Sequence, residues 1–294
     1  MSNIFVNLEA RNDTTSPQEV TVREVREPVV LPNPDQYTVA IDRFSIHKAW
    51  LPIFEDVHQL QIKLVRKSDS AAWTETLDFS AKTDANGMLW DVNDVLDVIN
   101  AHLTALCVNP GITAPTMSYS LSTGKGALDY SAQAGFADDY ELRFNEPLYS
   151  IYSTFDYVDV VFDQDFFKLN LVDAAPHTMT STDELNLSPV SKIYIKSNNM
   201  PLVYEYTPEA NNNRASEAIL TDFEFNGANR FPLQNINYTA TTGQYRFHSL
   251  TDATNFSVLQ LQFYYKTFGN NSYSLYFLPS GSVNVKLFFR PISR

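Results

Sequence analysis

Residues 259–265 read LQLQFYY and residues 283–290 read VNVKLFFR, and these two stretches decide the fold. In both, apolar side chains take every second position and mostly polar ones fall between them, which is the pattern of a β-strand with one buried face. Further strand-sized stretches lie between positions 192 and 278, separated by Asn, Gly, Pro and Asp. Short strands at this regular spacing predict an antiparallel β-sandwich or barrel.

The amino-terminal part of the chain adds strands and one helix. Alternating stretches predict strands at 3–10, 18–26, 36–46, 58–66 and 73–79. Apolar residues at three- and four-residue spacing predict a helix at about 92–107, with Asp91 as its N-cap and Pro110 beyond its end. We expect its apolar stripe to pack on the outside of the sandwich. A second short helix is predicted at 146–155.

The chain is long enough for one large all-β domain or two small ones. The polar stretches 110–135 and 173–189 read as long loops, and long loops in compact domains are often functional. We favour a single domain over residues 1–294, with an insertion at about 80–135 that contains the helix.

The charge of the chain argues against several partners. Its net charge is −13, from 34 acidic and 21 basic residues, and no basic arm is found before Glu27. Such a field repels phosphate backbones, so direct nucleic-acid binding is not expected. The chain start does not resemble a signal peptide, and no run of about 18 apolar residues predicts a membrane span. The single cysteine, Cys107, excludes an intramolecular disulfide and is expected to be buried.

Two carboxylates two positions apart are the best candidate for catalysis. Asp222 and Glu224 lie on a predicted strand, so both point to one face at about 7 Å separation, within the range of glycosidases. The other interpretation, which we favour, is a solvated strand face opposite Thr221, Phe223 and Phe225.

Metal and phosphate sites have little support in the sequence. Calcium binds oxygen ligands such as those of the acidic tract, but the spacing lacks the Asp-x-Asp-x-Asp-Gly loop, so an acidic surface or a cation-binding subunit contact is favoured. No two histidines have metal-helix spacing, and Gly124-Lys125-Gly126 lacks the other residues of a phosphate loop. We therefore predict no catalytic, cofactor or metal site and no enzymatic activity. The residues considered are Asp138, Asp139, Glu141, Asp156, Asp159, Asp163 and Asp165, with Arg143 as their only base, and His47, His58, His102, His177 and His248.

Four aromatic residues fall on the strand faces opposite the main apolar rows: Phe256, Tyr264, Tyr276 and Phe288. If they are exposed, they could stack on sugars or be buried by a neighbouring subunit. The alternative is burial on both faces of the sheet, beneath the helix or the loops.

The order of several motifs carries a resemblance. Residues 193–225 read IYIKSNNMPLVYEYTPEANNNRASEAILTDFEF; a Tyr-Arg strand at 244–247 follows, then paired aromatics at 263–265, and a Leu-Pro-x-Gly turn before the final strand at 286–290. Together with residues 136–155 and the helix around Asn100, this order resembles the penton, or minor capsid, proteins of polinton-like viruses, virophages and related double-jelly-roll DNA viruses. The resemblance covers about residues 90–294.

The resemblance implies a jelly-roll β-sandwich that forms homopentamers at icosahedral vertices and contacts the double-jelly-roll major capsid protein. It implies a place in the virion, after synthesis in the host cytoplasm or nucleus. The alternative from another class is a receptor-binding or carbohydrate-binding β-sandwich. The major capsid protein of a small single-jelly-roll virus is disfavoured by the missing basic arm, and a glycosidase using Asp222 and Glu224 comes third.

Overall fold

The computed structural model divides the chain into two compact units. Unit 1 consists of Met1–Leu51, Val190–Gly227 and Pro232–Arg294, and unit 2 of Pro52–Pro189 with Ala228–Phe231. The residues that the structure describes are 2–25, 31, 33–56, 59–158, 166–173, 175, 177–183, 185, 189–197, 199–202, 205–208, 214–224, 233–241, 245–251, 257–267 and 272–292.

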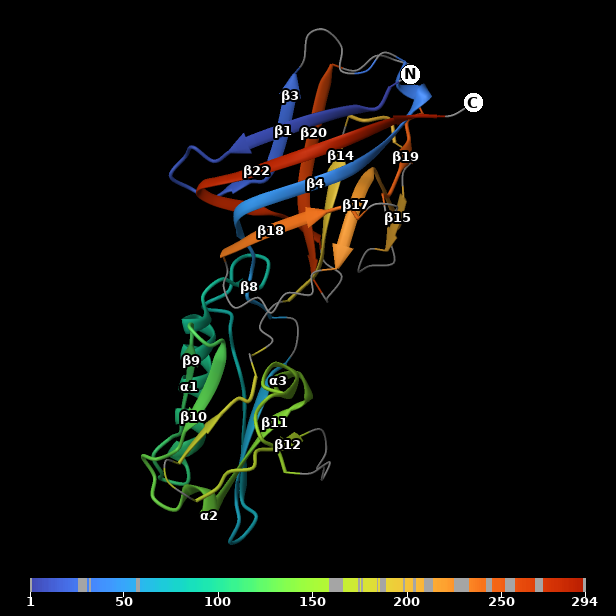
Figure 1. The fold of residues 1–294 in the computed structure, drawn as a ribbon. Helices are drawn as coiled ribbons and strands as arrows, with labels where there is room; N and C mark the ends of the chain where they lie inside the picture. The colour runs from blue at the N-terminus through green and yellow to red at the C-terminus, as the bar shows by residue number, and fades with distance from the viewer. Residues whose placement is uncertain are drawn as a thin grey trace. The chain divides into compact units, whose positions relative to one another are not determined.

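Unit 1 is a sandwich of two antiparallel sheets (Figure 1). Sheet A has the strand order β1, β22, β4, β18, with β2 on β22 and β19 on β4, and sheet B has the order β17, β14, β20, β21, with β3 also on β20. The bounds in sheet A are β1 Ile4–Arg11, β2 Gln18–Glu19, β4 Tyr37–Trp50, β18 Leu233–Thr239, β19 His248–Ser249 and β22 Tyr276–Pro291. Those in sheet B are β3 Thr21–Val25, β14 Val190–Ser197, β17 Ile219–Glu224, β20 Val258–Thr267 and β21 Ser272–Ser274. A short turn η1, Pro34–Gln36, and the hairpin of β15, Glu205–Pro208, with β16, Arg214–Glu217, complete the unit.

The winding of these strands is that of a jelly roll. Along the chain, β1, β3, β4, β14, β17, β18, β20 and β22 belong to sheets A, B, A, B, B, A, B and A. This alternation places strands that are far apart in sequence side by side, as in the jelly rolls of viral capsid and lectin domains. The predicted antiparallel jelly-roll sandwich is confirmed.

The alternation in the sequence explains the core of unit 1. The side chains of Leu259, Leu261 and Phe263 in β20 are buried, while the polar residues between them are half exposed. Val283 and Val285 in β22 are buried in the same way against them, within one apolar cluster shared by the two sheets. Burial of these facing rows is the main favourable contribution to folding of the sandwich.

The strand β22 contains the turn that the sequence predicts near its beginning. Residues before and after 278–281 both pair with β4, so this turn is a bulge within one strand and does not separate two strands. Ser280 has a left-handed backbone conformation with a φ of 60°. At Gly281 an added Cβ would lie 2.8 Å from the carbonyl oxygen of Leu278 and 2.9 Å from that of His47, so only glycine fits this position.

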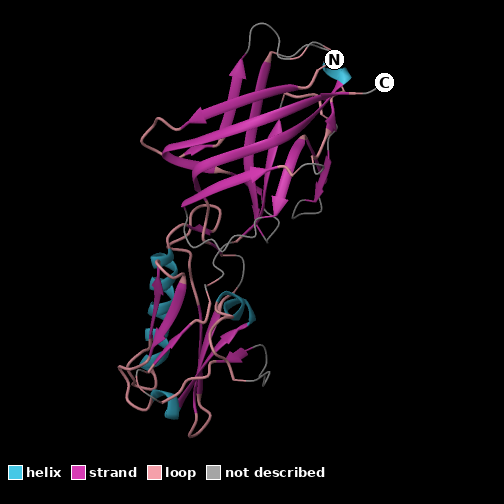
Figure 2. Cartoon of the chain, in the orientation of Figure 1, coloured by secondary structure: helices cyan, strands magenta, loops and turns pink. Residues whose placement is uncertain are grey.

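Unit 2 has its own core, built from two larger sheets, a two-stranded sheet and three helices (Figure 2). The sheet with strand order β12, β11, β6, β7 and the sheet with strand order β13, β10, β9 share one cluster of buried apolar side chains. In addition, β5 pairs with β8. Strand bounds are β5 Phe54–Glu55, β6 Gln61–Arg66, β7 Ala72–Thr76, β8 Met88–Leu89, β9 Thr116–Ser120, β10 Lys125–Asp129, β11 Tyr140–Asn145, β12 Phe166–Lys168 and β13 Thr178–Thr180. The helices are α1 Val92–Val108, α2 Phe136–Asp139 and α3 Glu146–Ile151.

The helix α1 forms where the sequence predicts it, but its packing differs from the expectation. The Asp91 carboxylate accepts a hydrogen bond from the Asn93 backbone N–H at 2.9 Å, the geometry of an N-cap. Its apolar stripe packs against β6, β7, β8 and β9, and its buried residues belong to the core of unit 2. The expected packing on the outside of the sandwich is therefore wrong.

The segment that interrupts unit 1 is longer than the predicted insertion. It runs from Pro52 to Pro189, whereas the sequence predicts an insertion at about 80–135. Two strands read as part of the sandwich lie in unit 2, where β6 pairs with β11 and β7 pairs with β6. The predicted loop at 110–135 contains the hairpin of β9 and β10. Alternation shows that a strand has one buried face, but it does not show which sheet the strand joins.

Burial makes the thiol of Cys107 unreactive. The residue is 3% exposed in the core of unit 2, and burial raises the pKa of its thiol to about 11. Only the thiolate reacts with alkylating agents, so we expect native protein at pH 8 to resist iodoacetamide and denatured protein to react fully. Mass spectrometry of the alkylated chain measures both, and rapid labelling of the native form would contradict the described packing.

Candidate interaction surface

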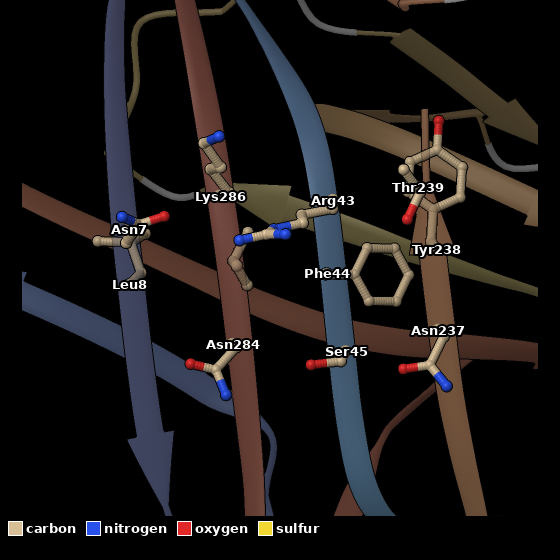
Figure 3. Close-up of a pocket in the computed structure, with 11 residues that line it drawn as sticks. Asn7, Leu8, Arg43, Phe44, Ser45, Asn237, Tyr238, Thr239, Asn284 and Lys286 are labelled. Atoms are coloured by element: carbon tan, nitrogen blue, oxygen red, sulfur yellow. The ribbon is translucent and has the colours of Figure 1, made fainter. Parts of the chain in front are cut away.

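The outer face of sheet A carries a polar hollow of about 470 Å³ (Figure 3). Cross-strand pairing aligns its side chains in two rows, because Lys286 lies opposite both Asn7 and Arg43, and Ser45 lies opposite both Asn284 and Asn237. The lining includes two cations and several amides and hydroxyls, but no carboxylate. The hollow can therefore donate many hydrogen bonds to an acceptor-rich or anionic group. Its lining is Asn7, Leu8, Arg43, Phe44, Ser45, Asn237, Tyr238, Thr239, Asn284, Val285 and Lys286.

A β-bulge in β4 determines the charge of the hollow. The register with β22 shifts between the pairs Lys286–Arg43 and Leu287–Ile41, so Asp42 is the extra residue. Asp42 accepts a hydrogen bond from the Tyr245 hydroxyl at 2.8 Å and lies 3.3 Å from the Lys286 ammonium. Its hydrogen bond raises the pKa of Tyr245. The negative charge of Asp42 thus offsets the positive charge of Lys286, and Arg43 is the exposed cation of the hollow.

An aromatic cluster lies beside the hollow. The ring of Phe5 stacks on that of Phe288 at 4.8 Å, and Tyr245 and Phe247 contact Phe288 edge-on at 5.5 and 5.6 Å. The Lys286 ammonium lies 4.4 Å from the centre of the Phe5 ring. Phe288 is only 9% exposed whereas Phe5 is 49% exposed. The exposed aromatic side chain on this face is thus Phe5, which the sequence analysis did not single out.

The other aromatic candidates have separate surroundings. Tyr264 stacks on Tyr194 at 5.5 Å on the outer face of sheet B, and the Lys196 ammonium lies 4.3 Å from the Tyr264 ring. Tyr276 is half-buried and its hydroxyl donates to the Glu19 carboxylate at 3.4 Å. Phe256 lies outside the described residues. Of the two interpretations left open, burial on both faces holds for Phe288, and partial exposure holds for Tyr264 and Tyr276.

Asp222 and Glu224 both lie on β17, as predicted, but their surroundings differ. Asp222 is paired with two cations: the Lys192 ammonium at 3.1 Å and the guanidinium of Arg246. Glu224 is exposed and lies opposite Lys192 in the register. Asp222 is thus part of an ion-pair network with Lys192 and Arg246, which Glu224 does not share in the described contacts.

The acidic tract is dispersed over unit 2. Glu141 pairs with Lys168 and Arg143, each at 2.6 Å. Burial raises the pKa of Glu141, but these two cations outweigh it, so the pKa is lowered overall. Asp156 accepts a hydrogen bond from Asn170 at 2.8 Å. Asp138 and Asp139 lie in α2, and Asp159, Asp163 and Asp165 lie outside the described residues. Within the described ranges, no group of three or more His, Cys, Asp or Glu side chains could hold a metal ion.

The four described histidines have different environments, and His58 lies outside the described residues. His248 is buried and hydrogen-bonds the Leu220 carbonyl oxygen at 2.9 Å, while His47 is exposed. His102 accepts from the Asp78 N–H at 3.2 Å, and His177 lies 3.4 Å from the Asp173 carboxylate.

The Gly124-Lys125-Gly126 segment closes the hairpin between β9 and β10. The Lys125 ammonium donates to the Thr182 carbonyl oxygen at 2.6 Å, so it is occupied within unit 2. A Cβ on Gly126 would lie 2.8 Å from the Leu185 side chain, which packs over the hairpin. Separately, the helices in the described part of the chain include none that is long and apolar enough to cross a membrane.

Comparisons with known proteins agree on the architecture. No protein-family model matches the chain, and no curated protein sequence matches it. Among solved structures, the crystal structure of the mavirus penton protein is similar with a TM-score of 0.84, at 23% identity, over 99% of this chain and 100% of that one. A chain in the cryo-EM structure of the Sputnik virophage is similar with a TM-score of 0.75, at 16% identity, over 98% of each chain. The chain thus has the fold of a virophage penton protein over its whole length, as its motif order indicates.

Proposed function

We propose that this protein is a structural capsid subunit: a penton that forms homopentamers at icosahedral vertices and contacts the major capsid protein. The observation that carries the proposal is the match of both units, over 99% of the chain, to the mavirus penton protein at a TM-score of 0.84. Fold alone does not determine function, since jelly rolls also occur in lectins and enzymes. The motif order and the charge of the chain add independent support.

The proposed role is burial of surface between subunits, without catalysis. Five identical subunits close a ring when each uses one surface to bind a different surface of its neighbour, a heterologous contact. The outer face of sheet A offers an exposed arginine, Arg43, and a half-exposed aromatic ring, Phe5, and both residue types are enriched in interfaces. With no basic arm, such a subunit belongs to the shell of the virion and not to the packaged genome.

The mass of the purified chain in solution tests this role. We expect a species of five times the 33.3 kDa chain, formed alone or together with the major capsid protein of the same virus, and closed shells when the two are mixed. Native mass spectrometry and electron microscopy measure the two results. A monomer that neither forms rings nor joins the major capsid protein into shells would contradict the proposal, and glycan-array binding by a monomer or trimer would favour the carbohydrate-binding alternative.

A further inference from the structure

The net negative charge of the chain comes entirely from one of its two units. Unit 1 contains 13 acidic and 13 basic residues, and unit 2 contains the other 21 acidic and 8 basic residues of the 34 and 21 in the chain. Unit 1 is therefore neutral, and the whole net charge of −13 belongs to unit 2. Two copies of the chain repel each other at long range, and local charge complementarity at a contact would offset this repulsion.

The hollow on sheet A provides one side of such a contact. Its lining lacks Asp and Glu, and the Arg43 guanidinium makes no hydrogen bond or ion pair with any residue that the structure describes. The exposed Arg43 lies opposite Lys286 and Thr239, and the small or amide side chains of Ser45, Asn237 and Asn284 form the adjacent row of the hollow. Arginine binds carboxylates through two parallel hydrogen bonds, and nearby amides and hydroxyls can hold the adjoining backbone.

We propose that this hollow is a docking site for a carboxylate-rich surface of a second copy of the chain, with Arg43 as its anchor. The inference rests on the proposed function, because it assigns one of the contacts that would close the ring. Charge complementarity identifies the occupant: the excess carboxylates of the chain lie on unit 2, and the hollow that lacks carboxylates lies on unit 1. The two surfaces are different, so the contact is heterologous, as a closed ring requires.

The β-bulge at Asp42 adds specificity to the contact. The Asp42 carboxylate lies 3.3 Å from the Lys286 ammonium and pairs with it. Lys286 therefore does not compete with Arg43 for an incoming carboxylate. An exposed ion pair contributes little, but one that becomes buried in an interface contributes substantially when both partners are also hydrogen-bonded. The amides of Asn237 and Asn284, in the adjacent row of the hollow, are the groups that would supply those further hydrogen bonds.

Charge reversal in the full-length chain tests the docking site. We expect Arg43→Glu to raise the dissociation constant for self-association by at least about thirtyfold, the minimum for removing one partner of a buried charge pair. Arg43→Lys should show a smaller loss, because it keeps the charge but not the two-pronged hydrogen bonding. Arg23→Glu on the outer face of sheet B is the matched control, since Arg23 is also an exposed strand arginine and the change in net charge is identical. Sedimentation velocity over a concentration series measures association, and far-ultraviolet circular dichroism verifies the fold.

The possible results distinguish a failure of the proposed docking site from a failure of the proposed penton role. Rings of Arg43→Glu that are as stable as wild type would overturn the docking site and leave the penton role intact. An equal loss in Arg23→Glu would show a general charge effect and would also overturn it. A wild-type chain that forms no ring, even with the major capsid protein, would overturn both. Binding of N-acetylneuraminic acid that depends on Arg43, without any change in association, would identify an acidic sugar as the occupant instead.

Discussion

Replacing Phe44 with alanine is expected to destabilise unit 1 by about 3–5 kcal/mol, the usual cost of truncating a buried phenylalanine. Phe44 is 2% exposed and lies on β4 in sheet A. Its ring is 5.7 Å from that of Phe263 and 5.4 Å from that of Phe223, both in sheet B, and 5.3 Å from that of Tyr238 in sheet A. The ring thus joins the two sheets, and removing it leaves a cavity that the rigid strands around it cannot fill.

Phe5→Ala is the matched control for this prediction. It removes the same number of atoms from the same sheet, but Phe5 is 49% exposed and its main contact is the stack on Phe288. We expect a loss of less than about 1.5 kcal/mol. Urea unfolding gives the free energies, and hydrogen exchange assigns each transition to unit 1 or unit 2, because the two units need not unfold together. Equal losses for the two variants would refute the described burial of Phe44.

Gly281→Ala is expected to have the second largest effect, a loss of about 1–3 kcal/mol from overpacking in unit 1. The new Cβ would lie 2.8 Å from the Leu278 carbonyl oxygen and 2.9 Å from the His47 carbonyl oxygen, and both belong to the backbone. The bulge of β22 would have to open, with loss of the hydrogen bond from the Asn12 N–H to the Gly281 carbonyl oxygen at 2.9 Å. Thermal unfolding of the variant measures the loss.

Gly126→Ala isolates the cause of that loss. Its added Cβ would also lie 2.8 Å from its nearest neighbour, but this neighbour is a terminal methyl of Leu185, which can rotate away. We expect a loss of less than about 1 kcal/mol, below the usual range for overpacking, because the far end of a side chain can shift where backbone carbonyls cannot. If the two alanine variants were equally destabilised, the rigidity of the backbone around Gly281 would not be the reason for the effect.

The strands of the sandwich were predictable because their alternation reports burial directly. The stretches around Leu261 and Val285 lie in β20 and β22 with the expected faces buried. The extent of unit 2 was not predictable, because strands 61–66 and 72–76 alternate like those of the sandwich and nothing local shows that they belong to the sheet of β11. Helix α1 was placed on the wrong partner for the same reason: an apolar stripe shows that a helix packs, not where.

The hollow on sheet A was missed by the sequence analysis, although one signal for it exists. In β4, two polar residues, Asp42 and Arg43, stand between the buried Ile41 and Phe44, where strict alternation allows one. Such an interruption is typical of a β-bulge, which turns both side chains toward the same side of a sheet. The neighbours of Arg43 come from β18 and β22, far away in the sequence, so only the fold could identify them.

The position of β22 has a consequence for how the protein is made. β22 is the last strand of unit 1 along the chain, yet it lies between β1 and β4 in sheet A. During translation, Pro52–Pro189 leaves the ribosome as one continuous piece, while β1 and β4 still lack the strand that joins them. The sandwich therefore closes only after β22 has been synthesised. A chain truncated before β22 would lack the strand that joins β1 to β4, so we expect it not to form the outer face of sheet A.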